Sequence, residues 1–209
     1  MPNLSNYTYS QVSNIPPREL ATYSVNDLAT LNSNSRGLYS AHLSLLSAQQ
    51  RDALSSTAVA NLTSNSIYGV NKYLIPDLSS SSSGFLSKLR GNASGFTKDQ
   101  MGWLSNDRLD TLHADAVANL TSDAVSGIAT WHLKWVSTSN NGFLSKLRGN
   151  AAGLTTAQLA ELNAEQINKL SNTSVASLTK EAVGGMSVAT LNYLSAIQCR
   201  ICPQRLLVA

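Results

Sequence analysis

Apolar residues recur along the chain in a rhythm of eight positions, which is clearest between residues 155 and 194. Each group of eight, here called an octad, has an apolar residue at its fifth and eighth positions and usually Ser, Thr or Asn at its first, as in TTAQLAEL at 155–162. Residues three apart fall on opposite faces of a strand but on about one face of a helix. The spacing therefore predicts helices and an all-α fold.

The octads predict many short helices rather than one long helix. In a continuous helix eight residues advance about 800°, so the apolar pair would rotate by roughly 80° per octad and wind around the rod. We expect one helix of about five or six residues per octad, marginal alone and stabilised by stacking on its neighbours. An α-solenoid or superhelix follows, with this buried ridge in its last part: Leu159, Leu162, Ile167, Leu170, Val175 and Leu178.

The first residue of each octad has the chemistry of a helix N-cap. Gln stands three residues after the cap in several octads, at Thr97 to Gln100, Thr155 to Gln158 and Asn163 to Gln166. This spacing is typical of a capping box, in which each side chain bonds the backbone N–H of the other residue.

A longer repeat contains the octads. GFLSKLRGNASGF at 84–96 returns as GFLSKLRGNAAGL at 142–154, which defines a 58-residue repeat, and a weaker match lies at 26–38. We interpret residues 1–209 as a single helical repeat domain with a partial unit at 5–38 and units at 39–96, 97–154 and 155–209. Because the first unit is partial, we expect the chain to be a fragment of a longer protein.

Helix-breaking residues interrupt the octads at expected corners, namely Pro16–Pro17, Pro76 and Gly184–Gly185. The serine run 79–83 shares its phase with STSNNG at 137–142. We therefore expect a loop between repeat units there rather than a disordered linker.

Composition narrows the function classes. Charged residues make up 13% of the chain, against about 25% in typical domains, and Ser, Thr and Asn fill 65 of 209 positions. The net charge of +3 is too small for the basic footprint of a nucleic-acid binder, so we expect no nucleic-acid partner. No stretch is apolar enough to span a membrane, and the N-terminus lacks a signal-peptide pattern, so a membrane would be reached only through an anchor outside this sequence.

The motifs of the common enzyme and cofactor sites do not occur. GxSxG, GxGxxG, the phosphate-binding GxxxxGK[ST] and HExxH are missing, and Asp99, Asp107 and Asp123 are explained by the charge preference of helix N-termini. His113 occupies a cap position and His132 the fourth octad position, and with His42 they are scattered over different octads. We predict no catalytic, cofactor-binding or metal-binding residues.

The two cysteines leave three alternatives open. Cys199 and Cys202 occupy the fifth and eighth positions of an octad, where buried apolar side chains are expected. A disulfide between them or to missing sequence is the second alternative, and a metal or redox role is the third.

Two further sets of residues have a structural and a functional interpretation. Lys88 and Arg90 recur as Lys146 and Arg148, either as a ladder for a polyanionic glycan or, as we favour, as stems that cover apolar surface with their charges in solvent. Trp103, Trp131 and Trp135 are confined to one unit and form either a surface aromatic patch or, as we favour, corner packing.

Asparagine sequons, which permit N-glycosylation in a secreted protein, occur at six positions. The Thr after two of them is also explained by capping. The six are Asn3, Asn6, Asn61, Asn92, Asn119 and Asn172.

The capped octads with Leu ends, the Pro-Pro corner in SNIPPREL and the block GFLSKLRGNASGFTKDQMGWL resemble the mesothelin family of superhelical, armadillo-type repeat glycoproteins. The resemblance implies an extracellular, N-glycosylated protein, often lipid-anchored, that acts in cell–cell or cell–matrix adhesion without catalysis. It transfers only the sequon role, to Asn61, Asn92, Asn119 and Asn172.

The expected function is thus an extracellular or cell-surface interaction module that binds another protein or glycoprotein. The alternative is a secreted bacterial octad-repeat surface protein or effector, because octads such as TTAQLAEL are also similar to the Thr-Gln-rich helical repeats of large bacterial surface proteins.

Overall fold

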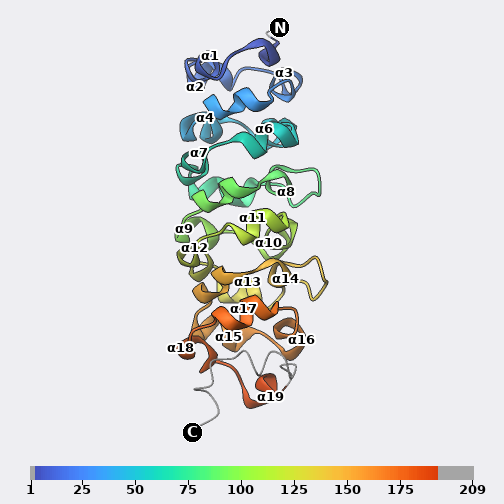
Figure 1. Cartoon of the computed structure of the whole chain (residues 1–209). Helices are drawn as coiled ribbons and strands as arrows, with labels where there is room; N and C mark the ends of the chain where they lie inside the picture. The colour runs from blue at the N-terminus through green and yellow to red at the C-terminus, as the bar shows by residue number, and fades with distance from the viewer. Residues whose placement is uncertain (1–2, 193–209) are drawn as a thin grey trace. The chain divides into compact units, whose positions relative to one another are not determined.

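The computed structural model describes residues 3–192, and every regular element in that part of the chain is a helix, as predicted (Figure 1). The residues form two compact units, which are not the repeat units of the sequence. The first is Met1–Phe96 with Thr111–Asn119, and the second is Thr97–Asp110 with Leu120–Ala209. The first unit holds η1 (Leu4–Asn6), α1 (Tyr9–Ser13), α2 (Pro17–Leu20), α3 (Val25–Ala29), η2 (Ser33–Gly37), α4 (Ser40–Leu45), α5 (Ala48–Ala53), α6 (Ser56–Asn61), α7 (Ser64–Tyr68), η3 (Lys72–Asp77), α8 (Phe85–Lys88), η4 (Gly91–Gly95) and α11 (Ala114–Ala118).

The second unit contains the remaining elements, except that α10 ends on a residue of the first unit. They are α9 (Lys98–Met101), α10 (Asn106–Thr111), α12 (Ser122–Ser126), α13 (Thr130–Leu133), α14 (Phe143–Lys146), η5 (Gly149–Gly153), α15 (Thr156–Glu161), α16 (Ala164–Ile167), α17 (Asn172–Ser177), α18 (Lys180–Val183) and α19 (Val188–Leu191).

The octads within residues 3–192 fold as predicted into one short helix each, and most of these helices begin behind a Ser, Thr or Asn cap; Pro16 and Ala129 are exceptions. Capping boxes form at Thr97, Thr155 and Asn163, where the cap side chain accepts a backbone N–H and the Gln side chain accepts the N–H of the cap residue. The fifth and eighth positions are buried throughout the predicted ridge, which is at most 4% exposed. Apolar burial against neighbouring helices, rather than length, therefore stabilises these helices.

The 58-residue repeat consists of a short and a long segment. Residues 39–62 are three octads that form α4, α5 and α6, whereas residues 63–96 form two octads, a serine loop, α8 and η4. Helices of one segment pack on those of the next: α4 contacts α2 and α7 in the first unit, and α15 contacts α13 and α18 in the second. The serine loop thus lies inside a repeat, not between repeats, so that part of the prediction was wrong. In Figure 1 loops project beside α8 and, in the other unit, beside α14.

The same backbone corner recurs at equivalent positions of successive repeats. Asn32, Arg90 and Arg148 precede η2, η4 and η5 with φ of −129°, −137° and −135° and ψ of −130°, −133° and −136°. Because the dihedrals agree while the residue types differ, the corner is set by its surroundings rather than by the residue that occupies it.

Glycine is required where two segments approach closely. A Cβ added at Gly95 would lie 2.0 Å from the carbonyl oxygen of Ser64, and one at Gly153 would lie 2.0 Å from that of Ser122. No glycine among the described residues has positive φ, so it is contact, not backbone conformation, that excludes a side chain here. Gly185 is another such close approach, with Thr156 O 2.2 Å from an added Cβ, but α18 and α19 follow one another at the eight-residue spacing, so Gly184–Gly185 does not interrupt the octads as predicted.

The predicted proline corners act differently. Pro16 and Pro17 begin α2 as its N-cap and first residue, a position where the missing N–H is harmless, and Pro76 lies within η3.

Candidate functional site

The capping glutamines have a second role that joins consecutive segments. The Nε2 of Gln158 donates to the carbonyls of Val125, Ser126 and Ile128 at 3.1, 3.3 and 2.7 Å, at the C-terminal end of α12. Gln50 and Gln166 make the same kind of contact with the ends of earlier helices. One amide therefore bonds an N–H at the start of its own helix and carbonyls at the end of another helix, groups that have no partner within their helices.

His42 performs this role where the later repeats have glutamine. It is the counterpart of Gln100, is fully buried, accepts the N–H of Tyr39 at Nδ1 (3.2 Å) and places Nε2 2.7 Å from the carbonyl of Ile15. This pattern requires the neutral ring with its proton on Nε2. Burial lowers the pKa of His42, while its bond to the Ile15 carbonyl acts in the opposite direction. His42 is a structural group, not a candidate base.

The repeated lysines also turn inward to helix ends. Lys88 Nζ donates to the carbonyls of Asp52 (2.5 Å) and Leu54 (2.8 Å) after α5, and Lys146 Nζ donates to Asp110 O (2.6 Å) in α10. Burial lowers the pKa of both ammonium groups, and Asp52 or Asp110 opposes that change. The prediction that these charges extend into solvent was wrong, because helix carbonyls offer them better partners. Neither lysine is free to form a polyanion ladder.

Two aspartates missed at the sequence level anchor the serine loops. The carboxylate of Asp110 accepts the N–H groups of Ser137 and Phe143, both at 2.7 Å, and Asp52 accepts that of Phe85 at 2.7 Å. Helices α14 and α8 start after glycines that have no side chain to cap them. The aspartate of the preceding segment supplies that cap.

Arg51 is the least expected buried group. It occupies the apolar fifth position of its octad and is 2% exposed, with NH1 bonded to the carbonyls of Leu43 (3.3 Å) and Leu46 (2.8 Å). Within the described part of the chain, its Nε has no hydrogen-bond partner. Burial lowers the pKa of Arg51, and Asp77 and Asp52 oppose the change.

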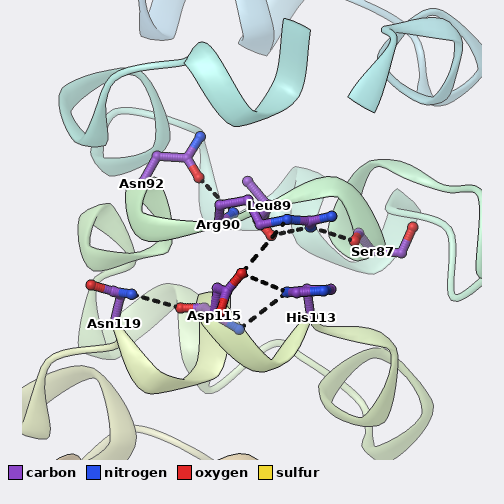
Figure 2. A network of polar contacts seen from close by, with 7 residues as sticks. All are labelled: Ser87, Leu89, Arg90, Asn92, His113, Asp115 and Asn119. Carbon is purple, nitrogen blue, oxygen red and sulfur yellow. Dashed lines mark hydrogen bonds and ion pairs between the residues drawn. The ribbon is translucent and has the colours of Figure 1, made fainter. Parts of the chain in front are cut away.

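Figure 2 shows the polar network around Arg90 and α11. Arg90 NH1 caps α8 through Ser87 O (3.0 Å) and Leu89 O (2.7 Å), and its Nε lies 4.0 Å from the Asp115 carboxylate. His113 is the N-cap of α11, as predicted: its Nδ1 accepts the N–H of Asp115 at 3.1 Å. Arg90 and His113 are partly exposed, Asp115 is exposed, and Arg90 and His113 bond to backbone groups at helix ends.

The sequons divide into accessible and structural ones. Asn61 and Asn119 are exposed at the ends of α6 and α11, where each Nδ2 donates to a carbonyl four residues earlier. Asn92 is 7% exposed and accepts the N–H of Arg90 (Figure 2). Its Nδ2 donates to Val59 O at 2.7 Å. A glycan on Asn92 is incompatible with this packing, because the nitrogen that would carry it is buried and bonded. Asn3, Asn6 and Asn172 are exposed.

The cysteine predictions lie outside the described residues, since Cys199 and Cys202 follow residue 192. Among residues 3–192 no group of three His, Cys, Asp or Glu side chains is arranged to hold a metal ion. None of the helices in this part of the chain has the length and apolar character needed to cross a membrane.

The tryptophans are where the preferred prediction of corner packing was wrong. Trp103, Trp131 and Trp135 are 44%, 65% and 68% exposed, and all three lie in the second unit. Lys134 Nζ lies 5.7 Å from the centre of the Trp135 ring, and the Trp131 and His132 rings are 5.7 Å apart. Burial, with the charge of Arg108, lowers the pKa of His132. The surface aromatic alternative agrees with the structure.

No protein-family model, curated protein or solved structure matches the chain.

Proposed function

We propose that this chain is a non-catalytic α-solenoid module that acts outside the cell or on its surface and binds another protein or glycoprotein, as in mesothelin-like adhesion. One observation carries the proposal: the polar side chains that the fold draws inward, which could otherwise carry chemistry, are used to cap helix ends. Gln158, Lys146 and Asp110 each hold backbone groups of another segment. What repeats of this kind offer a partner is a regular surface made from a small folding unit.

The accessible sequons support the extracellular side of the proposal. Asn61 and Asn119 occupy equivalent positions of two successive repeats and share one local geometry, so glycans on them would emerge from equivalent helix ends. The buried Asn92 provides an internal control that should stay unmodified.

A second candidate is the secreted bacterial octad-repeat protein or effector. It is favoured by the fact that the fold alone accounts for several sequon residues: Thr63 and Thr121 are N-caps, and Asn92 holds a corner. The Thr–Gln pairs likewise serve the fold.

Two measurements test the proposal. Mass spectrometry of the protein from its natural source should find glycans on the Asn61 and Asn119 peptides and none on Asn92, and unmodified peptides at all sequons would favour the bacterial candidate. The full chain, fluorescently labelled, should also bind cell-surface or matrix preparations saturably. Absence of such binding, or a hydrolase or transferase activity abolished by one point substitution, would defeat the proposal.

A further inference from the structure

Trp131 and Trp135 form an exposed aromatic pair that the fold does not use. They lie one helical turn apart, on α13 and the turn after it, where Lys134 N–H still donates to Thr130 O at 3.3 Å. Residues four apart in helical backbone lie on the same side of the helix, so both indoles lie on one exposed side of α13 and the turn after it. Neither indole N–H has a hydrogen-bond partner among the described residues. Buried indole N–H groups are usually bonded within the protein, whereas these two are exposed and can donate to a ligand.

A cation lies on this aromatic pair. Lys134 Nζ stands over the Trp135 ring and has no ion-pair partner within residues 3–192. A second ammonium group, that of Lys169, donates to Asn140 Oδ1 at 3.2 Å in the loop that follows Trp135 in the sequence. The nearby carboxylate of Asp110 already accepts two N–H groups. The surface therefore combines apolar ring faces with positive charge.

The loop that follows Trp135 adds fixed polar groups. Ser139, Asn140 and Asn141 are exposed, and Asp110 holds both ends of the loop through Ser137 and Phe143. Hydroxyl and amide groups are thus presented beside the indoles in a loop that needs little further ordering on binding.

The first repeat carries a related pair at the same phase. Tyr73, the counterpart of Trp131 in that repeat, is also 65% exposed, and Lys72 Nζ lies 5.8 Å from its ring centre. The combination of an exposed ring and an ammonium group thus recurs in both repeats.

We infer that Trp131, Trp135 and Lys134, with the loop 137–141, bind an acidic oligosaccharide. The C–H faces of its sugar rings stack on the indoles, its carboxylate or sulfate groups pair with the Lys134 ammonium, and its hydroxyls meet the indole N–H, Ser and Asn groups. An acidic peptide would gain most of its affinity from side chains inserted in pockets. One hollow of this unit, lined by Ser122, Thr155 and Glu181 among others, lies away from the aromatic pair and includes none of these residues.

This inference rests on the proposal that the chain is a binding module, and it is tested with the full chain. A hexasaccharide of alternating glucuronate and N-acetylglucosamine is titrated by calorimetry and by tryptophan fluorescence, which reports only the second unit because all three tryptophans are there. Trp131→Ala and Trp135→Ala should each weaken binding about tenfold. Lys134→Gln should weaken it severalfold and reduce its salt dependence.

Two controls make the result specific. Tyr9→Ala removes a ring of similar exposure (62%) in the first unit and should leave the affinity unchanged. The carboxyl-reduced hexasaccharide should bind the native chain as weakly as the acidic one binds Lys134→Gln. Because the substituted side chains are exposed, circular dichroism should show unchanged helix content in each variant.

The inference is overturned if the hexasaccharide does not bind at millimolar concentration, if Tyr9→Ala weakens it as much as Trp131→Ala does, or if polyglutamate binds with the same tryptophan dependence in its place. Cell-surface binding that persists in Trp131→Ala would leave the proposed function standing while removing this site. Loss of all cell-surface binding by the native chain would instead remove the proposed function.

Discussion

The repeats at 39–96 and 97–154 share their helices but bury different polar groups. His42 in the first corresponds to Gln100 in the second, and Arg51 corresponds to Leu109; all four are at most 2% exposed. Their octads nevertheless form short helices at equivalent places with buried fifth and eighth positions, although the last octad forms the 3-10 helix η3 in the first repeat and the α-helix α13 in the second. The comparison teaches that the fold requires certain hydrogen bonds and volumes, and that more than one residue type meets each requirement.

Their surfaces differ in another way. The exposed positions Leu45 and Tyr73 of the first repeat become Trp103 and Trp131 in the second. Since none of these side chains is buried, the change adds aromatic surface without repacking a core.

Arg51 and Leu109 occupy equivalent positions of the two repeats, and giving either position the other's residue should have the largest effect on stability. Leu109→Arg should destabilise the protein by about 4 kcal/mol, because it buries a charge that has no partner arranged for it. In the first repeat the charge of Asp77 favours the Arg51 cation, but the equivalent residue in the second repeat is Trp135. Arg51→Leu should be neutral or stabilising, since it removes a buried charge with an unbonded Nε. Urea unfolding measures both, and strong destabilisation by Arg51→Leu would show that the arginine is needed for more than volume.

A side chain at a close-contact glycine should be almost as damaging in either repeat. Gly153→Ala should cost about 3 kcal/mol, because the added Cβ meets the backbone of Ser122 and neither can move alone. Gly149 is the matched control: nothing lies within 4 Å of an added Cβ, so Gly149→Ala should change the stability little. Equal effects of the two substitutions in thermal unfolding would contradict the close approach.

Removal of a capping glutamine should have an intermediate effect. Gln158→Ala should cost about 2 kcal/mol, because buried carbonyls after α12 and the N–H of Thr155 lose their partner. Gln158→His should recover part of this loss at neutral pH if His42 is a true equivalent. Denaturant titrations of both variants test this, and a histidine no better than alanine would break the equivalence.

The histidine should make the first repeat sensitive to acid. Because burial lowers the folded-state pKa of His42, its contribution is fully present above the unfolded pKa of about 6.5 and is lost as the pH falls below it. The melting temperature of the native chain should therefore fall more steeply between neutral pH and pH 5 than that of His42→Gln. His132 is present in both the native protein and the His42→Gln variant. Parallel plots of melting temperature against pH would therefore show that His42 is not the group responsible.

The smallest effect is expected at the caps. Thr155→Ala or Thr97→Ala should each cost about 1 kcal/mol, since the N–H of Gln158 or Gln100 loses its acceptor. The exposed Thr57 inside α6 is not a cap, and Thr57→Ala should lie within about 0.5 kcal/mol of the native chain. Thermal stability that is unchanged in both cap variants would contradict the octad register.

The sequence predicted what depends on neighbours in the chain. Caps and burial at the fifth and eighth positions follow from residues within one octad, and both were confirmed in the octads from Thr155 to Leu178. The helix length was predicted less well, because several octads form helices of four residues instead of five or six, among them α16, α18 and α19. The contacts between segments were missed, because Gln158 looks like a simple capping residue until Val125 and Ile128 are placed against it.

The same reason explains the errors at individual sites. Lys88 and Asn92 are residue types that usually lie on the surface, but here they donate hydrogen bonds to carbonyls more than thirty residues earlier in the chain. The tryptophans were assigned to corner packing, and only the packed backbone shows that α9, α13 and the turns after them leave the three side chains exposed. For Asn92, its counterpart in the next repeat was the available signal: Asn150 has the same neighbours and no sequon.

The capping of one segment by the next has a consequence for synthesis on the ribosome. The donors that satisfy the carbonyls after α12 come from Gln158, 30 to 33 residues further along the chain. A nascent segment therefore leaves the exit tunnel with its helix ends open and completes its bonds only when its successor has emerged. Folding should accordingly trail translation by about one segment.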